Sequence, residues 1–416
     1  MELEHLEGLF YKLNECSTSE QINIIWRKYN LTDDSFLIVE GLNDTLNPTE
    51  EINYILSHEL ICTYFKTTNL QFFSNKIIND TKRDKHPRDY VDYSLMFDTN
   101  ICSYINGIIN GKSIEDYEKV IPLLIEILHK ELRYDFSFYM YENSVQIKEG
   151  FTDENELWDS LNKNFKENLL NLIRFKYIKP EDANSFKTSI SDLNAEKEAK
   201  DLCSKFYIKT EDLLNKIKFK YKLEKLIILK ILEIQFNDNR AHQNKFLDFV
   251  DFMNKYSCFS DRESILAIEY FKDKNHESFK KIHKGMKDEK FLKIINNISW
   301  DLVAPRLMED FIGGMSSNKK VFLPFFLSND RNLRDTINTY PTKYVFINGD
   351  QDKRRIVSVP TMNTHEYLYK NSYHKAIKEI DDKAEERRKN MPNLQSNLDN
   401  YLTLGYENCK KALKIG

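Results

Sequence analysis

The stretch Ser94–Tyr104, SLMFDTNICSY, is the part of the chain from which its fold is best inferred. A short apolar run ends at Asp98, and the small polar residues Thr99 and Asn100 precede an apolar helical pattern. This order predicts a buried strand that carries a carboxylate at its C-terminal tip, followed at once by a helix. Ligands of open α/β sheets bind at the C-terminal ends of strands, so Asp98 is a candidate functional residue. The alternative is that Asp98 or Thr99 only caps the following helix.

A second stretch of the chain shows the same order of an apolar run, a polar tip and a helical pattern. Val321–Leu327, VFLPFFL, is apolar throughout and is followed by Ser328, Asn329 and Asp330, after which a helical pattern begins. We therefore expect a second buried strand with an acidic tip. Tyr344–Ile347 predicts one more short strand.

Two further acids lie on predicted helices. Glu142 follows an aromatic run, RYDFSFYMYENSVQI, whose rings are expected to pack as core. Asp301 lies beside Trp300 in IINNISWDLVAPRLMEDFI, where Pro305 predicts a kink or a restart of the helix. An acid beside a kink and a buried tryptophan is not an ordinary surface residue.

The four acids Asp98, Glu142, Asp301 and Asp330 could converge on one site. Carboxylate oxygens are the ligands that hard cations such as Mg²⁺ and Mn²⁺ prefer. A cation held in this way lowers the pKa of a bound water and stabilises charge on a phosphodiester. Carboxylates packed together raise one another's pKa unless a cation is present, so metal binding should weaken as the pH falls.

The composition limits the class of protein. The chain has 416 residues, of which 41% are hydrophobic and 30% are charged, so we expect a packed, soluble protein. Its net charge of −4 argues against a surface that is basic overall, although a local basic groove stays open. The six cysteines are scattered without CxxC spacing, which argues against a zinc knuckle. An acidic N-terminus and the lack of a long apolar run predict a cytoplasmic protein without a signal peptide or membrane span.

Most of the remaining sequence has helical periodicity. Residues 1–90 are expected to be mainly helical, with a polar linker at Asp80–Asp89. Residues 155–255 form a charged section without a strand pattern. Its lysines are either ordinary solvated faces or the lining of a nucleic-acid groove. The tail from Thr364 to Gly416 is also expected to be helical, with a break at Met391-Pro392.

Taken together, these residues resemble those of the PIN-domain nucleases. Asp98 in FDTN and Asp330 in SNDRNL match the acids at the two strand tips of that family. Asp301 in SWDLVAPRLME matches the acid of a later helix, and Glu142 in YMYEN matches the helix-borne glutamate. The resemblance implies a three-layer α/β fold with a Rossmann-like parallel sheet. It also implies metal-dependent phosphodiester hydrolysis, most often of single-stranded RNA.

The resemblance also implies roles for individual residues. Asp98, Asp301 and Asp330 would hold one or two Mg²⁺ or Mn²⁺ ions, and Glu142 would complete the ligand shell or orient the attacking water. Glu269, in LAIEYF, is the alternative to Glu142 as the helix-borne ligand. Additional candidate acids are Asp261, Glu263 and Glu309, and candidate phosphate contacts are Arg306 and Arg331. For the first two acids a favourable interaction with the helix dipole is a sufficient explanation. For the two arginines an ion pair with a neighbouring acid is the simpler one.

A domain layout follows from the resemblance. We expect a helical N-terminal region at 1–88 and the first part of a PIN-like domain at 89–150. A large helical insertion at 151–258 would separate this part from the second, at 259–350. A helical C-terminal region at 351–416 would complete the chain.

The resemblance implies an endoribonuclease, with RNA favoured over DNA as substrate. From how such domains are often deployed, we expect a role as a toxin or in anti-phage defence. The alternative is an inactive PIN-like scaffold that binds nucleic acid or protein. In both cases the helical extensions would bind a protein partner or a second copy of the chain. A third interpretation is an all-helical adaptor whose acids are only caps, and it requires that no parallel sheet exists.

Overall fold

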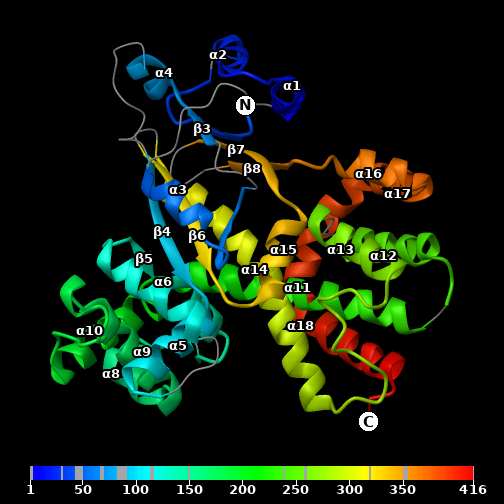
Figure 1. Cartoon of the computed structure of the whole chain (residues 1–416). Coiled ribbons are helices and arrows are strands. Elements are labelled where there is room, and N and C mark those ends of the chain that lie inside the picture. The colour runs from blue at the N-terminus through cyan, green and yellow to red at the C-terminus, as the bar shows by residue number, and fades with distance from the viewer. Residues whose placement is uncertain are drawn as a thin grey trace. The chain divides into compact units, whose positions relative to one another are not determined.

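In a computed structural model of the chain, the described residues are 3–29, 31–42, 50–65, 70–81, 91–112, 117–148, 150–237, 239–256, 260–317, 320–349 and 355–415. They form a mixed α/β structure that divides into two compact units (Figure 1). The first unit contains Met1–Glu211, Pro305–Arg331 and Pro341–Thr361. The second contains Asp212–Ala304, Asn332–Tyr340 and Met362–Gly416.

These units do not follow the layout expected from the sequence. The section 151–258, expected as one insertion, is shared between the units at residues 211 and 212. The expected boundaries at 88/89, 258/259 and 350/351 lie outside the described residues, as does most of the linker expected at Asp80–Asp89. The domain boundaries therefore stay predictions.

The first sheet contains both acid-tipped strands. Its strand order is β2 (Ile61–Thr63), β6 (Val321–Leu327), β4 (Val91–Phe97) and β5 (Tyr134–Asp135). β4 pairs in parallel with β6 and β5, and β2 pairs antiparallel with β6. Because a parallel sheet is present, the all-helical adaptor is wrong.

The register of β4 and β6 aligns their C-terminal ends. Phe97 lies opposite Leu327, and the backbone N–H of Asp98 donates a hydrogen bond to the carbonyl of Leu327 (3.0 Å). The two strands predicted before Asp98 and at Val321–Leu327 are therefore confirmed. Asp98 and Ser328, which follow them, leave the sheet at the same edge.

A second sheet belongs to the first unit as well. Its order is β3 (Leu70–Phe73), β1 (Phe36–Glu40), β7 (Thr342–Asn348) and β8 (Arg355–Pro360), and all its pairs are antiparallel. β7 confirms the short strand predicted at Tyr344–Ile347.

The helical assignment of both terminal regions is therefore wrong in part. β1, β2 and β3 lie within 1–88, and β8 lies within 351–416. Every residue of β1 is buried, as expected for a strand enclosed on both faces. Such a short apolar run cannot be distinguished from a buried helix by its periodicity. Its partner β7 comes about 300 residues later, so nothing local indicates the pairing.

The first unit also contains helices. In chain order they are α1 (Leu3–Asn14), α2 (Ser19–Lys28), α3 (Glu50–Ser57), α4 (Asn75–Thr81), α5 (Thr99–Ile109), α6 (Tyr117–His129), α7 (Ser137–Ser144), α8 (Glu154–Ser160), α9 (Lys163–Lys176) and α10 (Asp192–Tyr207). α5 follows β4 directly and packs on α9. Its buried side includes Ile101, Cys102 and Ile105, which agrees with the predicted apolar stripe.

The second unit is largely helical. Its helices are α11 (Glu211–Asn237), α12 (His242–Tyr256), α13 (Asp261–Lys272), α16 (Thr364–Lys370), α17 (His374–Asp382) and α18 (Ala384–Leu413). α12 packs against α13, α17 and α18 around an apolar core that includes Ile227, Phe246 and Phe249. The described residues of 155–255 contain no strand, as predicted. α15 (Arg331–Thr339) begins in the first unit and continues in the second.

Neither a helix restart at Pro305 nor the break expected at Met391-Pro392 occurs in the described helices. α14 (Asp288–Met315) passes from the second unit into the first and is continuous through Pro305, and α18 is continuous through Pro392. An interior proline removes one helical hydrogen bond. Around Pro305, Ala304 and Leu307 are almost fully buried, so packing holds the helix despite that loss.

Phe97, at the end of β4, provides a test of this packing. It is fully buried, and its ring lies near those of Tyr134 (5.1 Å between centroids), Phe136 (5.8 Å) and Phe175 (6.2 Å). Because Phe97→Ala leaves a cavity among these rings, we expect the free energy of unfolding in a denaturant titration to fall by about 3–5 kcal/mol. Tyr11→Ala, at a largely exposed ring, should change it by less than about 0.5 kcal/mol. A loss below about 1 kcal/mol for Phe97→Ala would contradict the packing.

Candidate acidic site

Asp98 stands at the junction of β4 and α5. It occupies the N-cap position of α5, but its side chain makes no capping hydrogen bond. Its Oδ2 instead accepts hydrogen bonds from the hydroxyl of Ser328 (2.7 Å) and the amide of Asn100 (3.2 Å). Only 5% of Asp98 is exposed. Helix capping therefore does not explain why an acid stands here.

The tip of β6 brings a second acid to this point. The buried hydroxyl of Ser328 donates to Asp98 and accepts a hydrogen bond from the backbone N–H of Asp330 (2.9 Å). The amide of Asn329 donates to the hydroxyl of Tyr104 on α5 (3.2 Å). One serine thus connects the two acid-bearing turns that the sequence analysis singled out.

Glu142 comes to the same place from α7. Its carboxylate accepts a hydrogen bond from the hydroxyl of Thr99, the residue after Asp98. α7 is held by its aromatic residues, because Phe138 is buried and its ring lies 4.4 Å from that of Phe326 on β6. The aromatic run therefore packs as core, as expected, and thereby positions Glu142.

Asp98 interacts electrostatically with both Glu142 and Asp330, so these three acids lie close together. The pKa of Asp98 is raised to about 6, mainly by burial and also by the charge of Asp330, while the hydrogen bond from Ser328 opposes the increase. The pKa of Glu142 is raised to about 7, mainly by burial and also by the charge of Asp98, while the hydrogen bond from Thr99 opposes the increase. Burial first, and then the charges of both acids, raise the pKa of the Cys102 thiol. Asp98, Glu142 and Asp330 form what we call the acidic site.

Asp301 is not one of the residues that form the acidic site. It is half-buried on α14 and lies in the second unit, whereas the acidic site lies in the first. Its convergence with the other three acids stays a prediction.

Glu269 has partners of its own in the second unit. Although burial opposes it, hydrogen bonds from Tyr367 and Lys272 lower the pKa of Glu269. The ammonium of Lys272 lies 3.2 Å from its carboxylate. A carboxylate that is already ion-paired has less need of a cation, which favours Glu142 over Glu269 as the helix-borne ligand.

The two acids in the first turn of α13 also have local partners. Burial raises the pKa of Asp261, which is hydrogen-bonded to Thr364 and Tyr340. Glu263 is fully buried and accepts a hydrogen bond from the hydroxyl of Ser260. These contacts explain both acids within the second unit, and a role for them in metal binding stays a prediction.

Three candidates remain in the first unit. Glu309 on α14 accepts a hydrogen bond from the hydroxyl of Tyr64 (3.2 Å). Arg306, on the preceding turn of α14, is half-buried. Arg331 is exposed and begins α15 directly after Asp330. Because of this adjacency Arg331 is the better candidate for a phosphate contact.

The donor atoms of the acidic site suit a hard cation. Carboxylate and hydroxyl oxygens are the ligands preferred by Mg²⁺ and Mn²⁺. In the part of the chain that the structure describes, however, no three His, Cys, Asp or Glu side chains are arranged as a metal site. The chemistry of the donor atoms nevertheless fits a hard cation.

Sequence reasoning did not identify the two hydroxyl residues of the site. Thr99 and Ser328 were considered only as helix caps or as polar tips. In the structure their hydroxyls hold the carboxylates of Glu142 and Asp98. The available signal was that each follows a buried strand and lies within two residues of a candidate acid.

Comparisons with known proteins identified no relative of this chain. No protein family, no curated protein and no solved structure matches the chain. The resemblance to PIN-domain nucleases therefore rests on the residues named above.

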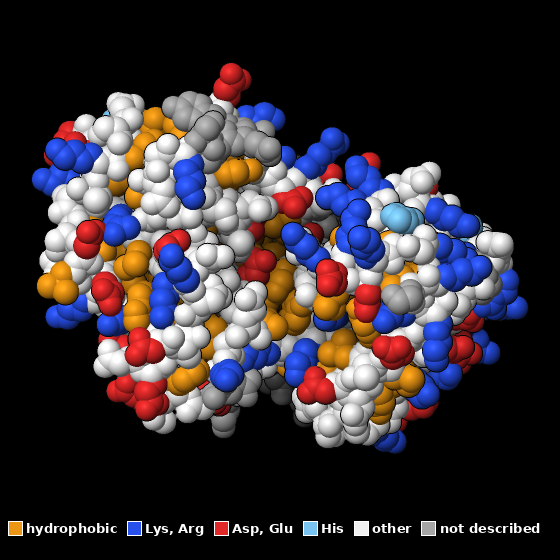
Figure 2. Space-filling view, turned by 90° about the horizontal axis from the view of Figure 1, so that it is seen from below, with side chains coloured by type: hydrophobic (Ala, Val, Ile, Leu, Met, Phe, Trp, Pro, Cys, Tyr) orange, Lys and Arg blue, Asp and Glu red, His pale blue; other side chains and the backbone are white. Residues whose placement is uncertain are grey.

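One face of the protein carries charges of both signs. On this face, shown in Figure 2, Lys and Arg side chains are interspersed with Asp and Glu side chains. This mixture agrees with the net charge of −4 and differs from the uniformly basic surface of many nucleic-acid-binding proteins. Among the described helices, none has the length and apolar character that crossing a bilayer requires.

The acidic site should make the stability depend on pH. Asp98 and Glu142 have higher pKa values folded than unfolded, so the folded protein binds more protons between about pH 4 and pH 7. With a chelator present, the free energy of unfolding should therefore fall as the pH rises through this window. Asp98→Asn removes one buried charge and should raise that free energy at pH 8 by roughly 1–3 kcal/mol.

The matched comparison is Glu156→Gln, which neutralises an exposed acid in the first unit. It should leave the pH dependence measured by chemical denaturation unchanged. If Asp98→Asn stabilises the protein as much at pH 4 as at pH 8, then Asp98 does not carry the buried charge.

Proposed function

We propose that this chain is a metal-dependent nuclease, an endoribonuclease that cleaves single-stranded RNA. The observation that carries the proposal is the meeting of Asp98, Glu142 and Asp330 at the C-terminal edge of the parallel strands β4 and β6. This is the edge at which open α/β sheets bind their ligands. We propose further that this sheet and its helices form a three-layer PIN-like fold.

The cofactor that suits these residues is Mg²⁺ or Mn²⁺. Asp98, Glu142 and Asp330 would hold it, together with Asp301 if that acid converges as the resemblance implies. When bound, such a cation lowers the pKa of a water and stabilises charge on the phosphodiester. The raised pKa values of Asp98 and Glu142 support this assignment, because a bound cation would stabilise the charged forms of carboxylates that burial and neighbouring acids disfavour.

The surrounding residues of the chain have positioning roles in this proposal. Ser328 holds the carboxylate of Asp98 through its hydroxyl, and Thr99 holds that of Glu142. These hydrogen bonds restrict the orientations of both carboxylates, as ligands outside the first shell of a metal commonly do. Glu142 would complete the ligand shell or orient the attacking water, and Arg331 would contact phosphate.

The alternative function is that of an inactive PIN-like scaffold, in which Asp98, Glu142 and Asp330 would hold no catalytic cation. In that case the chain would bind RNA or a protein through its helical additions without cutting. For the nuclease we propose a role as a toxin or in anti-phage defence, and under either function we propose a cytoplasmic location.

A cleavage assay separates the two functions. Purified full-length protein with Mn²⁺ or Mg²⁺ should cut single-stranded RNA, and excess chelator should stop it. Asp98→Asn should lower the rate by about a hundredfold or more, because it removes a ligand and its charge. Glu156→Gln, at an exposed acid, should cut at the wild-type rate.

The scaffold predicts a different result. RNA would be bound without being cut under every metal condition, and Asp98→Asn would behave as the wild type does. Cleavage that persists at the wild-type rate in Asp98→Asn would show that another site, or a contaminant, is responsible.

A further inference from the structure

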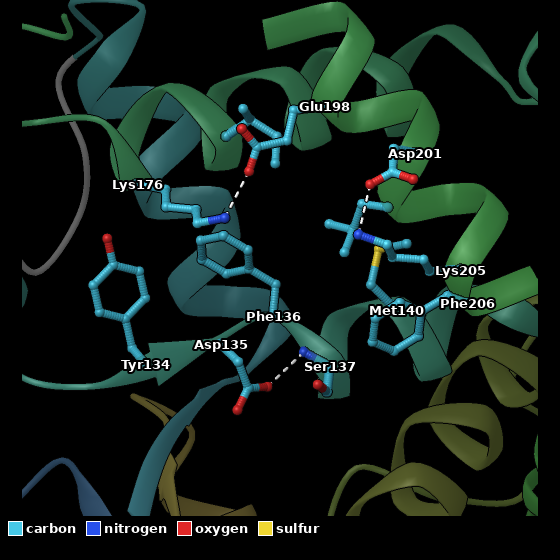
Figure 3. A pocket seen from close by; sticks show the side chains of 12 residues that line it. Tyr134, Asp135, Phe136, Ser137, Met140, Lys176, Glu198, Asp201, Lys205 and Phe206 are labelled. Atoms are coloured by element: carbon cyan, nitrogen blue, oxygen red, sulfur yellow. Dashed lines mark hydrogen bonds and ion pairs between the residues drawn. The ribbon is translucent and has the colours of Figure 1, made fainter. Parts of the chain in front are cut away.

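A cavity of about 200 Å³ lies in the first unit among β5, α7, α9 and α10 (Figure 3). Its walls are mostly apolar and include Phe136, Met140, Ile173, Leu202 and Phe206. In Figure 3 the rings of Phe136 and Phe206 and the thioether of Met140 border the same space. Aromatic rings and a thioether are suited to pack against a flat ring system.

Four charged side chains of the cavity form two ion pairs. Lys176 lies 2.6 Å from Glu198, and Lys205 lies 2.6 Å from Asp201, as the dashed lines in Figure 3 show. Since each lysine is already paired with a carboxylate, the cavity is a poor site for a free phosphate. It offers both hydrogen-bond donors and acceptors beside its apolar walls.

Asp135 adds another carboxylate to the lining of the cavity. Its carboxylate accepts hydrogen bonds from the hydroxyl of Ser94 and from the backbone N–H of Ser137 (2.8 Å). These bonds fix its orientation at the edge of the cavity. A neutral planar heterocycle with N–H donors and carbonyl acceptors matches such a lining better than an anion or an aliphatic chain does.

The cavity and the acidic site are built on the same elements. α7 supplies Ser137 and Met140 to the cavity and Glu142 to the acidic site. On β5, Asp135 lies opposite Met96 of β4, two residues before Asp98. β5 and α7 therefore connect the cavity to the acidic site.

We propose that this cavity binds one base of the single-stranded nucleic acid whose backbone lies at the acidic site. The proposal deepens the proposed nuclease function and rests on it for the choice of a nucleobase. The volume is below the roughly 300 Å³ at which pockets for drug-sized ligands begin, so it suits one base and not a whole nucleotide. Recognition of unstacked bases by aromatic packing and edge hydrogen bonds is common in RNA-binding proteins.

The test uses nucleosides, which have a base and no phosphate. Adenosine, guanosine, cytidine and uridine are titrated into full-length protein in excess chelator, and binding is followed by ligand-observed NMR. At least one should bind to the wild type. Asp98→Asn should bind it equally well, because the base cavity does not need the acidic site.

Two substitutions on α10 form a matched pair. Leu202→Trp, at a half-buried position of the lining, fills the cavity and should weaken nucleoside binding by about tenfold or more. Leu193→Trp makes the same change at a position that is 78% exposed, and it should leave binding unchanged. If Leu202→Trp does not fold, Lys205→Met removes a donor at a largely exposed side chain and should weaken binding severalfold. Its control is Lys163→Met, whose side chain is 86% exposed.

The proposal is overturned if none of the four nucleosides binds to the wild type. It is also overturned if binding is unaffected by both Leu202→Trp and Lys205→Met. These measurements use no cation and follow no cleavage. If the protein cuts RNA but shows no such nucleoside binding, the nuclease function is supported and the base cavity is rejected. If it binds nucleosides as predicted but does not cut RNA, only the base cavity is supported.

Discussion

The parallel register of β4 and β6 is the constraint on which the acidic site depends. Seven consecutive residue pairs, from Val91–Val321 to Phe97–Leu327, align the two strands. The residues that follow, Asp98 and Ser328, must then emerge together, although they are 230 residues apart in the chain. A shift of one residue would remove the hydrogen bond between them and turn the strand side chains to the opposite face.

The acids held at this edge are unfavourable for stability, which is why we assign them a function. A buried carboxylate is penalised by desolvation and by like charges, and Asp98 and Glu142 are subject to both. Hydrogen bonds from Ser328 and Thr99 offset only part of that penalty. Groups of this kind concentrate at functional sites, where a ligand or a cation compensates them. In the cavity among β5, α7, α9 and α10, by contrast, both lysines are paired with carboxylates.

Elements encoded by nearby residues could be predicted from the sequence, and elements that depend on residues far away in the chain could not. Local signals sufficed for β4 and for β6, because an apolar run with a polar tip is complete within about ten residues. They did not suffice for β1, whose partner β7 is about 300 residues away, or for α14, where packing keeps a helix intact through Pro305. The hydroxyl contacts of Thr99 and Ser328 depend on side-chain positions that only the folded chain defines.

The most direct test of the central claim is a crystal structure of the protein soaked with Mn²⁺, with data collected at a wavelength where manganese scatters anomalously. The account predicts an anomalous peak within about 2.0–2.6 Å of carboxylate oxygens from Asp98 and at least one of Glu142 and Asp330. No peak at these side chains, or a lysine or arginine paired with them in its place, would contradict it.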